Sequence, residues 1–230
     1  MSHLRKDKHP DRPTHTVEDY LLFMFEMVRD DDEIVAARLA ELLNVTPATV
    51  AMTLKRMERD QWIINKGRGD IHLTDTGLMA AKSVTRRHML VECMLVDLLK
   101  MPINETHREA HAIEHAISPA LEERLYQVLD HPKLCPHGNP FPGYESLTKD
   151  WTRLTEIDAG ERVIIRRIHT FAEENPDLIK FLVENGVNPG ISAELVEKLS
   201  FNQTLSLQIH EEIVTLGFQA ANLIFAEIFD

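Results

Sequence analysis

The sequence contains only two cysteines, Cys93 and Cys135, among its 230 residues. Two cysteines cannot build the disulfide framework of a small secreted domain, and their scarcity is typical of a reducing cytoplasm. No run approaches the ~18–20 consecutive apolar residues that a membrane span needs. The first 13 residues, MSHLRKDKHPDRP, are charged and lack the apolar stretch of a signal peptide. We therefore expect a cytoplasmic protein with no membrane partner, whose first residues form a mostly disordered arm.

An excess of basic residues is also missing, because the net charge is −12 at pH 7. The charge is distributed unevenly. Residues 1–90 contain 14 Lys or Arg and 14 Asp or Glu, whereas residues 91–230 contain 11 and 23. The second part would repel phosphate, so it cannot bind nucleic acid through its charge. The first part can bind nucleic acid if its basic residues lie on one face.

Residues 1–75 have the pattern of a winged helix-turn-helix domain. Residues 16–29 and 34–43 have apolar side chains at helical spacing, and Thr46 is placed to cap a third helix over 47–60. A Gly-Arg-Gly turn then joins two strand-like runs into a β-hairpin. In this motif the helix after the turn enters the major groove of DNA. On that helix and the hairpin, the expected DNA-binding residues are Thr46, Thr49, Thr53, Lys55, Arg56, Arg59, Lys66 and Arg68. The alternative is a small helical domain whose basic face is only solvated.

The rest of the chain divides into a helical part and a part rich in strands. Residues 76–145 contain three helical segments and end within HPKLCPHGNPFPGYESL, whose prolines and glycines indicate a linker. Residues 146–230 contain several strand-like runs and one short helix, and resemble an SH3-like barrel. We therefore expect a mainly α protein with β structure, built from a winged helix-turn-helix, a helical dimerisation and metal domain, and a C-terminal SH3-like β domain.

Histidines and glutamates are concentrated on two of the predicted helices. His88 and Glu92 are four residues apart on the first helix, so they share a face. The second helix carries four such residues within about 100° of arc: His107, His111, Glu114 and His115. If the two helices pack together, six nitrogen and oxygen ligands meet, a set that suits Mn(II), Fe(II), Co(II) or Zn(II). The alternative is that these are ordinary surface or core residues.

The segment from His111 to His115 also matches the H-x-x-E-H pattern of inverted zinc peptidases, in which the glutamate acts as general base. Such a short match is expected by chance in a histidine-rich helix, and a peptidase would leave the DNA-binding pattern without a purpose. We therefore expect no enzymatic activity and no small-molecule substrate. A zinc metallopeptidase and a metal-buffering protein remain the alternatives.

Several motifs together resemble the diphtheria toxin repressor family of iron- and manganese-dependent transcriptional repressors. TVEDYL is similar to the family's ligand-bearing first helix, LKRMERD to the end of its recognition helix, and RRHMLVE, THREAHAIEH and GNPFPG to its dimerisation and metal domain. The likeness covers nearly the whole chain. It implies a homodimer that binds double-stranded DNA at a palindromic operator and controls metal-homeostasis genes. The activating cofactor would be Mn(II) or Fe(II), with Zn(II) or Co(II) able to substitute in vitro.

The resemblance also implies two metal sites per chain. The primary site would use Asp19, His111, Glu114 and His115. The ancillary site would use His88, Glu92 and His107, with help from the third domain. In the matching stretch of the third domain, FAEENPDLIKF, the candidate ligands are Glu174 and Asp177.

Two of these positions bear on the choice of metal. His111 stands where iron-type members commonly have Cys and manganese-type members Glu. Asp19 stands where manganese-type members have Asp and iron-type members Met, and a carboxylate is a harder ligand than a thioether. Asp19 therefore favours Mn(II), and no sulfur ligand is expected in either site unless Cys93 approaches.

Overall fold

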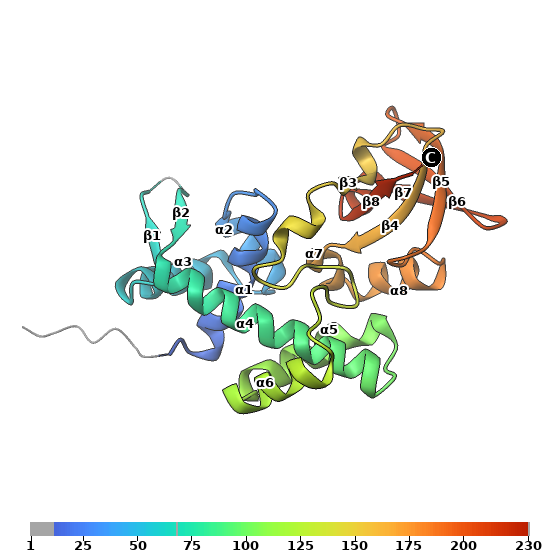
Figure 1. Cartoon of the computed structure of the whole chain (residues 1–230). Helices are drawn as coiled ribbons and strands as arrows, with labels where there is room; N and C mark the ends of the chain where they lie inside the picture. Colours follow the sequence, from blue (N-terminus) through green and yellow to red (C-terminus); the bar gives the residue numbers. More distant parts are fainter. Residues whose placement is uncertain (1–11, 68, 230) are drawn as a thin grey trace, which may run out of the picture. The chain divides into compact units, whose positions relative to one another are not determined.

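The computed structural model describes residues 12–67 and 69–229, and it divides into two compact units, residues 1–86 and 87–230 (Figure 1). The boundary lies inside helix α4 (Asp75–Cys93), so this one helix contributes residues to both units. The expected disordered arm falls almost entirely outside the described residues. Within the described part of the chain, no helix has the length and apolarity that a membrane span requires.

The first unit contains the predicted three helices and hairpin. Thr46 caps the third helix as expected, because its hydroxyl accepts a hydrogen bond from the backbone N–H of Thr49 at 3.2 Å. The hairpin is closed by the Asn65 side chain, which accepts a hydrogen bond from the backbone N–H of Gly67 at 2.9 Å. The elements are α1 (His15–Arg29), α2 (Ala36–Leu42), α3 (Pro47–Arg59), β1 (Ile63–Asn65) and β2 (Ile71–Leu73), followed by the first residues of α4.

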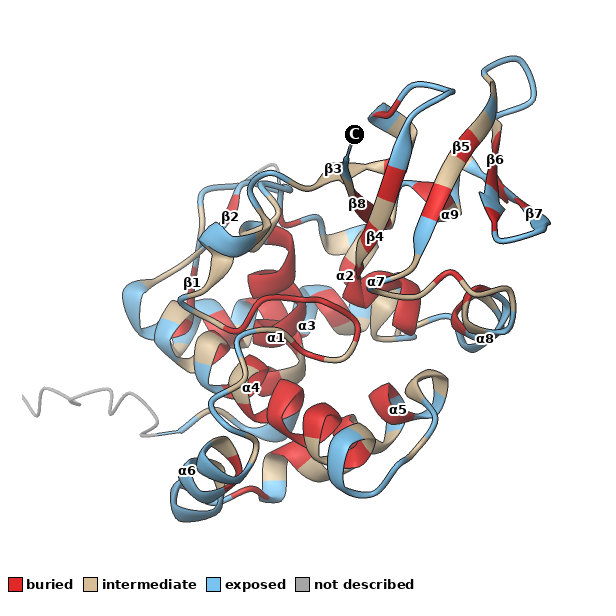
Figure 2. Ribbon diagram, turned by 45° about the vertical axis from the view of Figure 1, so that its right-hand side comes forward, coloured by how far each residue is buried: buried red, intermediate tan, exposed pale blue. Residues whose placement is uncertain are grey.

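Helix α1 is buried along most of its length, as its red colour in Figure 2 shows. Leu21, Leu22 and Met24 are fully buried on it, whereas Asp19 is half-buried. Because α1 is surrounded on most sides, it is held in a defined position within the fold.

The second unit begins with the helical layer. Its elements are the end of α4, a π-helical turn η1 (Met94–Leu98), α5 (Ile103–Ile113), a 3₁₀ turn η2 (Glu114–Ala116) and α6 (Pro119–Val128). We expected one helix to carry all four ligands from His107 to His115. This prediction is wrong for Glu114 and His115, because the α-helix ends at Ile113 and these two residues lie in the 3₁₀ turn. The Arg87 side chain donates a hydrogen bond to the carbonyl oxygen of Glu114 at 3.1 Å, at the point where the chain tightens into the 3₁₀ turn.

The stretch expected to be a linker forms an ordered loop over residues 135–140, which we call the CPHGNP loop. Leu134 and Pro140 form a β-bridge at its base, and the backbone N–H of Cys135 donates to the carbonyl of Asn139 at 2.9 Å. The carbonyl of His137 accepts a hydrogen bond from the backbone N–H of Ile168 at 2.8 Å. The loop is therefore fixed against the C-terminal β domain.

The C-terminal part is an antiparallel six-stranded sheet in the order β3-β8-β4-β5-β6-β7. Its core contains fully buried aliphatic side chains such as Val163, Ile165, Leu195 and Leu207. The strands are β3 (Thr152–Arg153), β4 (Arg162–Ile168), β5 (Ser192–Leu199), β6 (Thr204–Ile209), β7 (Glu212–Gly217) and β8 (Ile224–Ile228). Helices α7 (Thr170–Glu173) and α8 (Pro176–Glu184) lie between β4 and β5, and α9 (Phe218–Ala221) lies between β7 and β8. The mixed architecture with a C-terminal β domain is as predicted.

Candidate metal centre

Ligand-type side chains from five segments of the second unit meet in its interior. The buried last turns of α4, together with α5 and η2, supply part of these side chains. Helix α7 and the CPHGNP loop supply the others from the C-terminal part of the unit. The residues that contribute are His88, Glu92, His107, His111, Glu114, His115, Cys135, His137, Glu173 and Glu174.

His88 lies at the middle of this group. Its Nδ1 is 2.5 Å from Oε2 of Glu114, and its Nε2 is 3.2 Å from Nδ1 of His107 and 3.4 Å from Oε1 of Glu92. The last contact follows from the sequence, because residues four apart on a helix share a face. His88 thus connects the buried carboxylates of α4 and η2.

Three imidazoles form a compact triangle. The ring centroids of His88, His107 and His111 are 4.6 to 4.8 Å apart. Glu174 closes the triangle from the C-terminal side, since its Oε1 is 2.7 Å from Nε2 of His107 and 3.4 Å from Nε2 of His111. These residues supply nitrogen and oxygen atoms on one side of the centre, and Glu174 was among the expected ligands.

A second group of ligand-type atoms was not anticipated from the sequence. The atoms that Glu92, Cys135 and His137 offer lie within 4.8 Å of one another, and all three residues are buried. Nδ1 of His137 is 3.4 Å from Oε1 of Glu92 and 3.0 Å from Oε2 of Glu173. Glu173 also approaches His107, with 3.1 Å between Oε2 and Nδ1. The sulfur next to the centre is therefore that of Cys135, not Cys93.

The charges of the centre are strongly coupled. Burial lowers the pKa of His88, but the Glu92 and Glu114 carboxylates outweigh this and raise it to about 10. Burial raises the pKa of Glu114, and the neighbouring His88 and His111 bring it down to about 2. Without a metal, the raised pKa of His88 and the lowered pKa of Glu114 favour a protonated imidazole opposite an ionised carboxylate.

Five buried polar atoms of the centre test whether a cation fits. Oε1 of Glu92, Oε1 of Glu114, Oε2 of Glu173 and both ring nitrogens of His137 have no hydrogen-bond partner among the described residues. Imidazole nitrogens or carboxylate oxygens lie within 4 Å of several of them. Buried polar atoms rarely stay unsatisfied, and carboxylate and imidazole atoms around one point are the ligand set of Mn(II), Fe(II), Co(II) and Zn(II). The residues present therefore fit a divalent cation.

Two expected ligands lie outside this group. Asp177 is exposed in the first turn of α8, and within the described chain it joins none of the clusters of ligand-type atoms. Asp19 belongs to the first unit, so its ligation together with Glu114 and His115 stays a prediction. His111 lies between the two expected sites, because its Nδ1 is 3.4 Å from Oε1 of Glu114 and its Nε2 faces Glu174.

The expected DNA-binding residues that the structure describes lie on α3, at its N-terminal cap and in the hairpin of the first unit. Lys55, Arg59 and Lys66 are exposed. Thr53 is only 7% exposed and lies on the inner side of α3 with Val50, Leu54 and Met57, so the expectation that it faces DNA is wrong. Thr46 and Thr49 share a hydrogen bond of 3.0 Å between their hydroxyls, and Arg56 is half-buried. Arg68 lies outside the described residues.

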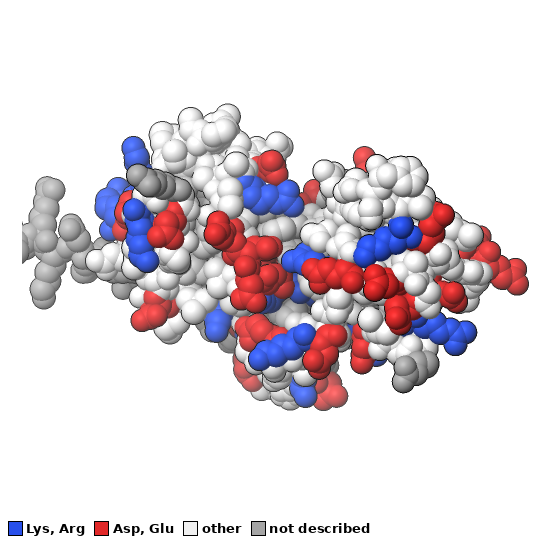
Figure 3. Space-filling view, turned by 90° about the horizontal axis from the view of Figure 1, so that it is seen from above, with Lys and Arg blue, Asp and Glu red and all other residues white. Residues whose placement is uncertain are grey.

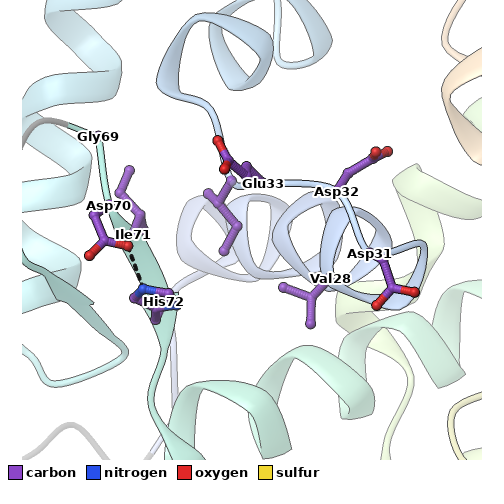
Figure 4. A pocket seen from close by; sticks show the side chains of 9 residues that line it. Val28, Asp31, Asp32, Glu33, Gly69, Asp70, Ile71 and His72 are labelled. Carbon is purple, nitrogen blue, oxygen red and sulfur yellow. Dashed lines mark hydrogen bonds and ion pairs between the residues drawn. The ribbon is translucent and has the colours of Figure 1, made fainter.

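A pocket of about 460 Å³ lies between the turn after α1 and the hairpin (Figure 4). Glu33 contributes from the turn, and on the hairpin His72 pairs with Asp70 at 2.5 Å. Asp31 and Asp32 add two further carboxylates to its lining. This side of the unit would repel phosphate, so the charge distribution favours α3 and the tip of the hairpin as the DNA-facing surface.

Three family models match consecutive parts of the chain. Residues 13–71 match the N-terminal DNA binding domain of the iron dependent repressors. Residues 74–143 match the metal binding and dimerisation domain of the same family. Residues 152–228 match the FeoA domain. Together these matches extend over most of the chain.

Curated relatives and a solved structure show the same likeness. The iron-dependent repressor IdeR of Mycobacterium leprae is 33% identical over 223 residues, which cover 92% of this chain and 96% of that protein. The diphtheria toxin repressor of Corynebacterium diphtheriae is 32% identical over 194 residues, which cover 80% of this chain and 85% of that protein. The structure of the manganese regulator SloR superposes with a TM-score of 0.79 at 26% identity, covering 93% of this chain and 98% of that one.

Proposed function

We propose a mechanism from the premise that this chain belongs to the diphtheria toxin repressor family and is a metal-dependent, DNA-binding transcriptional repressor. The observation that carries the mechanism is the group of buried carboxylate and imidazole atoms that lack hydrogen-bond partners in the second unit. We propose that this centre binds Mn(II) or Fe(II), and that the bound metal switches DNA binding on.

Two sites would divide the ligands of the centre. Glu114 and His115, with His111, would form one site, for which we propose Asp19 of α1 as a further ligand. The other site lies between α4, α5 and the C-terminal β domain, and its ligands are His88, Glu92, His107, Glu173 and Glu174, with Cys135 and His137 adjoining. A bound divalent metal would supply positive charge beside the carboxylates, and the imidazoles that hold it would have to give up their protons.

As a ligand, Asp19 would join α1 to the helical domain. A metal that has a higher affinity for this joined arrangement shifts the population towards it. In a homodimer the two α3 helices must lie about one DNA turn apart, ~34 Å, to enter successive major grooves. We therefore propose that metal binding fixes this spacing and that the operator is palindromic.

The peptidase alternative is not supported. The family consists of DNA-binding transcriptional regulators. Glu114 is fully buried, and its carboxylate faces His88 on one oxygen and His111 on the other. A general base must reach a water molecule at the substrate, which this carboxylate does not.

The test is a measurement of DNA binding with and without metal. A palindromic site would be selected from a random library with the Mn(II)-loaded dimer, and fluorescence anisotropy would then compare metal-free and Mn(II)-loaded protein. We expect tight binding only with Mn(II), and a loss of Mn(II) affinity of about tenfold or more in Glu173→Gln. Asp177→Asn, four residues away and exposed, is the matched control and should behave as wild type. Equal DNA binding with and without metal would contradict the mechanism, and metal binding without any DNA binding would favour a metal buffer.

A further inference from the structure

The outer face of α3 is apolar in its first two turns. Exposed residues recur at helical spacing, three, four and seven positions after Ala48: Ala51, Met52 and Lys55. Met52 is a large apolar residue in the middle of this helix, and it is 68% exposed.

Met52 takes no part in the core of its unit. The inner face of α3 already supplies Val50, Leu54 and Met57, all buried. Lys55 follows Met52 one turn later, and both Lys55 and Arg59 are exposed beyond it. Figure 3, which looks down on the hairpin, shows several Lys and Arg side chains at this end of the first unit, with Asp and Glu side chains among them. An apolar surface bordered by cations suits the major groove, where methyl groups lie between two rows of phosphates.

The part of this face that precedes Lys55 lacks the side chains that pair with the other bases. Asn and Gln pair with adenine and Arg or Lys with guanine, but positions 48, 51 and 52 carry Ala, Ala and Met. The hydroxyls of Thr46 and Thr49 are already engaged with each other in the helix cap. For Ala48, Ala51 and Met52 themselves, the readout that remains is apolar contact with the 5-methyl group of thymine.

We propose that Met52, with Ala48 and Ala51 beside it, selects thymine in each operator half-site through the thymine methyl group. This inference rests on the proposed binding of α3 in the major groove. Lys55 and Arg59 would contact phosphates and carry no sequence information. Met52 is thus a specificity-determining residue, and polar hydrogen bonds to base edges do not determine the sequence at the positions that it faces.

Uracil substitution tests the proposal, because uracil differs from thymine only by the missing methyl group. Each thymine of the selected palindromic site would be replaced by uracil in turn, and the affinity of the Mn(II)-loaded dimer measured. We expect wild-type protein to lose about fourfold in affinity at the positions that face Met52. In Met52→Ala the uracil and thymine sites should bind equally. Met79→Ala, which shortens a 73% exposed methionine on α4 of the same unit, should keep the wild-type sensitivity.

The outcomes separate this inference from the repressor mechanism. Equal affinity of wild-type protein for all uracil and thymine sites would overturn the inference, as would the same uracil sensitivity in wild type and Met52→Ala. Either result leaves metal-dependent DNA binding intact. A wild-type protein that binds no DNA in response to Mn(II) would overturn the mechanism and the inference together.

Discussion

His88 controls the charge balance of the metal centre. It lies between the buried carboxylates of Glu92 and Glu114, which raise its pKa to about 10 against the effect of burial. The pKa values of His107 and His137 are likewise raised, by Glu173 among others, although burial lowers them. At neutral pH the metal-free centre therefore holds protons on imidazoles that must be neutral to bind a metal.

We predict that Mn(II) binding releases protons and strengthens as the pH rises. The pKa of His88 in the folded state exceeds its value of 6.5 in the unfolded state, so its contribution to the stability of the metal-free protein is fully present below pH 6.5. That contribution is lost as the pH approaches 10, and the competition between proton and metal weakens over the same range. Calorimetric titration with Mn(II) in phosphate and in Tris should give enthalpies that differ with the ionisation enthalpy of the buffer. Identical enthalpies would contradict the prediction. His72→Gln, which removes an exposed histidine of the hairpin, is the control. This variant should show the same difference in binding enthalpy between the two buffers as the wild type.

The expected ligands and the missed ligands differ in their local sequence context. His88 with Glu92, and His107 with His111, were predictable because helical spacing places them on one face. Cys135 and His137 were missed because the prolines and glycines around them indicated a linker, although the Cys-x-His spacing was itself a signal. Glu173 was missed beside Glu174 because the short helix α7, which sets their directions, has no periodic pattern of its own.

At the scale of elements, the CPHGNP loop connects the metal centre to the C-terminal sheet. Arg167 of β4 is fully buried and donates a hydrogen bond to the Asn139 side chain at 2.7 Å. Asn139 in turn donates to Oε1 of Glu173 at 3.1 Å, which leaves Oε2 facing His107 and His137. The loop therefore determines which oxygen of Glu173 points to the centre.

Gly138 allows this close approach. Its φ is +84°, and a Cβ at this position would lie 2.0 Å from the carbonyl oxygen of Arg166. Gly143 also has a positive φ, +96°, but a Cβ there would meet nothing within 4 Å. An alanine at Gly143 would therefore suffer only from the positive φ, whereas an alanine at Gly138 would also clash with the backbone of β4.

We predict that Gly138→Ala destabilises the second unit more than Gly143→Ala. Each substitution costs about 1 kcal/mol for the positive φ, and the clash at Gly138 should add about 2 kcal/mol or more. Urea unfolding of the metal-free protein measures the difference in the free energy of unfolding. Gly138→Ala should also weaken Mn(II) binding, because the clash displaces His137 and Asn139. Equal effects of the two substitutions would show that the loop can move away from β4 without cost.

Secondary structure was predictable where periodicity was long. The three helices of the first unit, the hairpin, and strands β4 to β7 follow from their sequence patterns. Strands β3 and β8 were missed. Strand β3 has only two residues, and the only turn-forming residue shortly before β8 is Asn222. The 3₁₀ turn at Glu114 could not be predicted, since it coincides with a hydrogen bond from Arg87, which lies 27 residues earlier in the sequence.

At the scale of the whole chain, charge and function are divided in the same way. The acidic residues 91–230 include most of the proposed metal ligands, with the exception of His88 and Asp19, and Figure 3 shows groups of carboxylates among the other residues of the second unit. The balanced residues 1–90 include the DNA-binding helix and hairpin. Negative charge attracts cations but repels DNA, so an acidic metal-binding unit needs a separate unit to bind the operator. Signal and response must then be coupled through the chain.

The proposed coupling runs through Asp19, and hydrogen exchange can test it. Mn(II) should slow amide exchange in wild-type protein both in α5 and η2, which carry His111 and Glu114, and in α1, which carries Asp19. In Asp19→Asn the neutral amide is a weaker ligand than a carboxylate, so we expect slower exchange in α5 and η2 only, with α1 unchanged by Mn(II). Asp31→Asn, which removes an exposed carboxylate from the turn after α1, is the matched control and should respond as wild type. If Mn(II) still protects α1 in Asp19→Asn, the metal acts on the first unit by another route. If α1 stays unprotected even in wild-type protein, metal binding does not reach the first unit through α1, and activation must operate on the dimer through residues 87–230 alone.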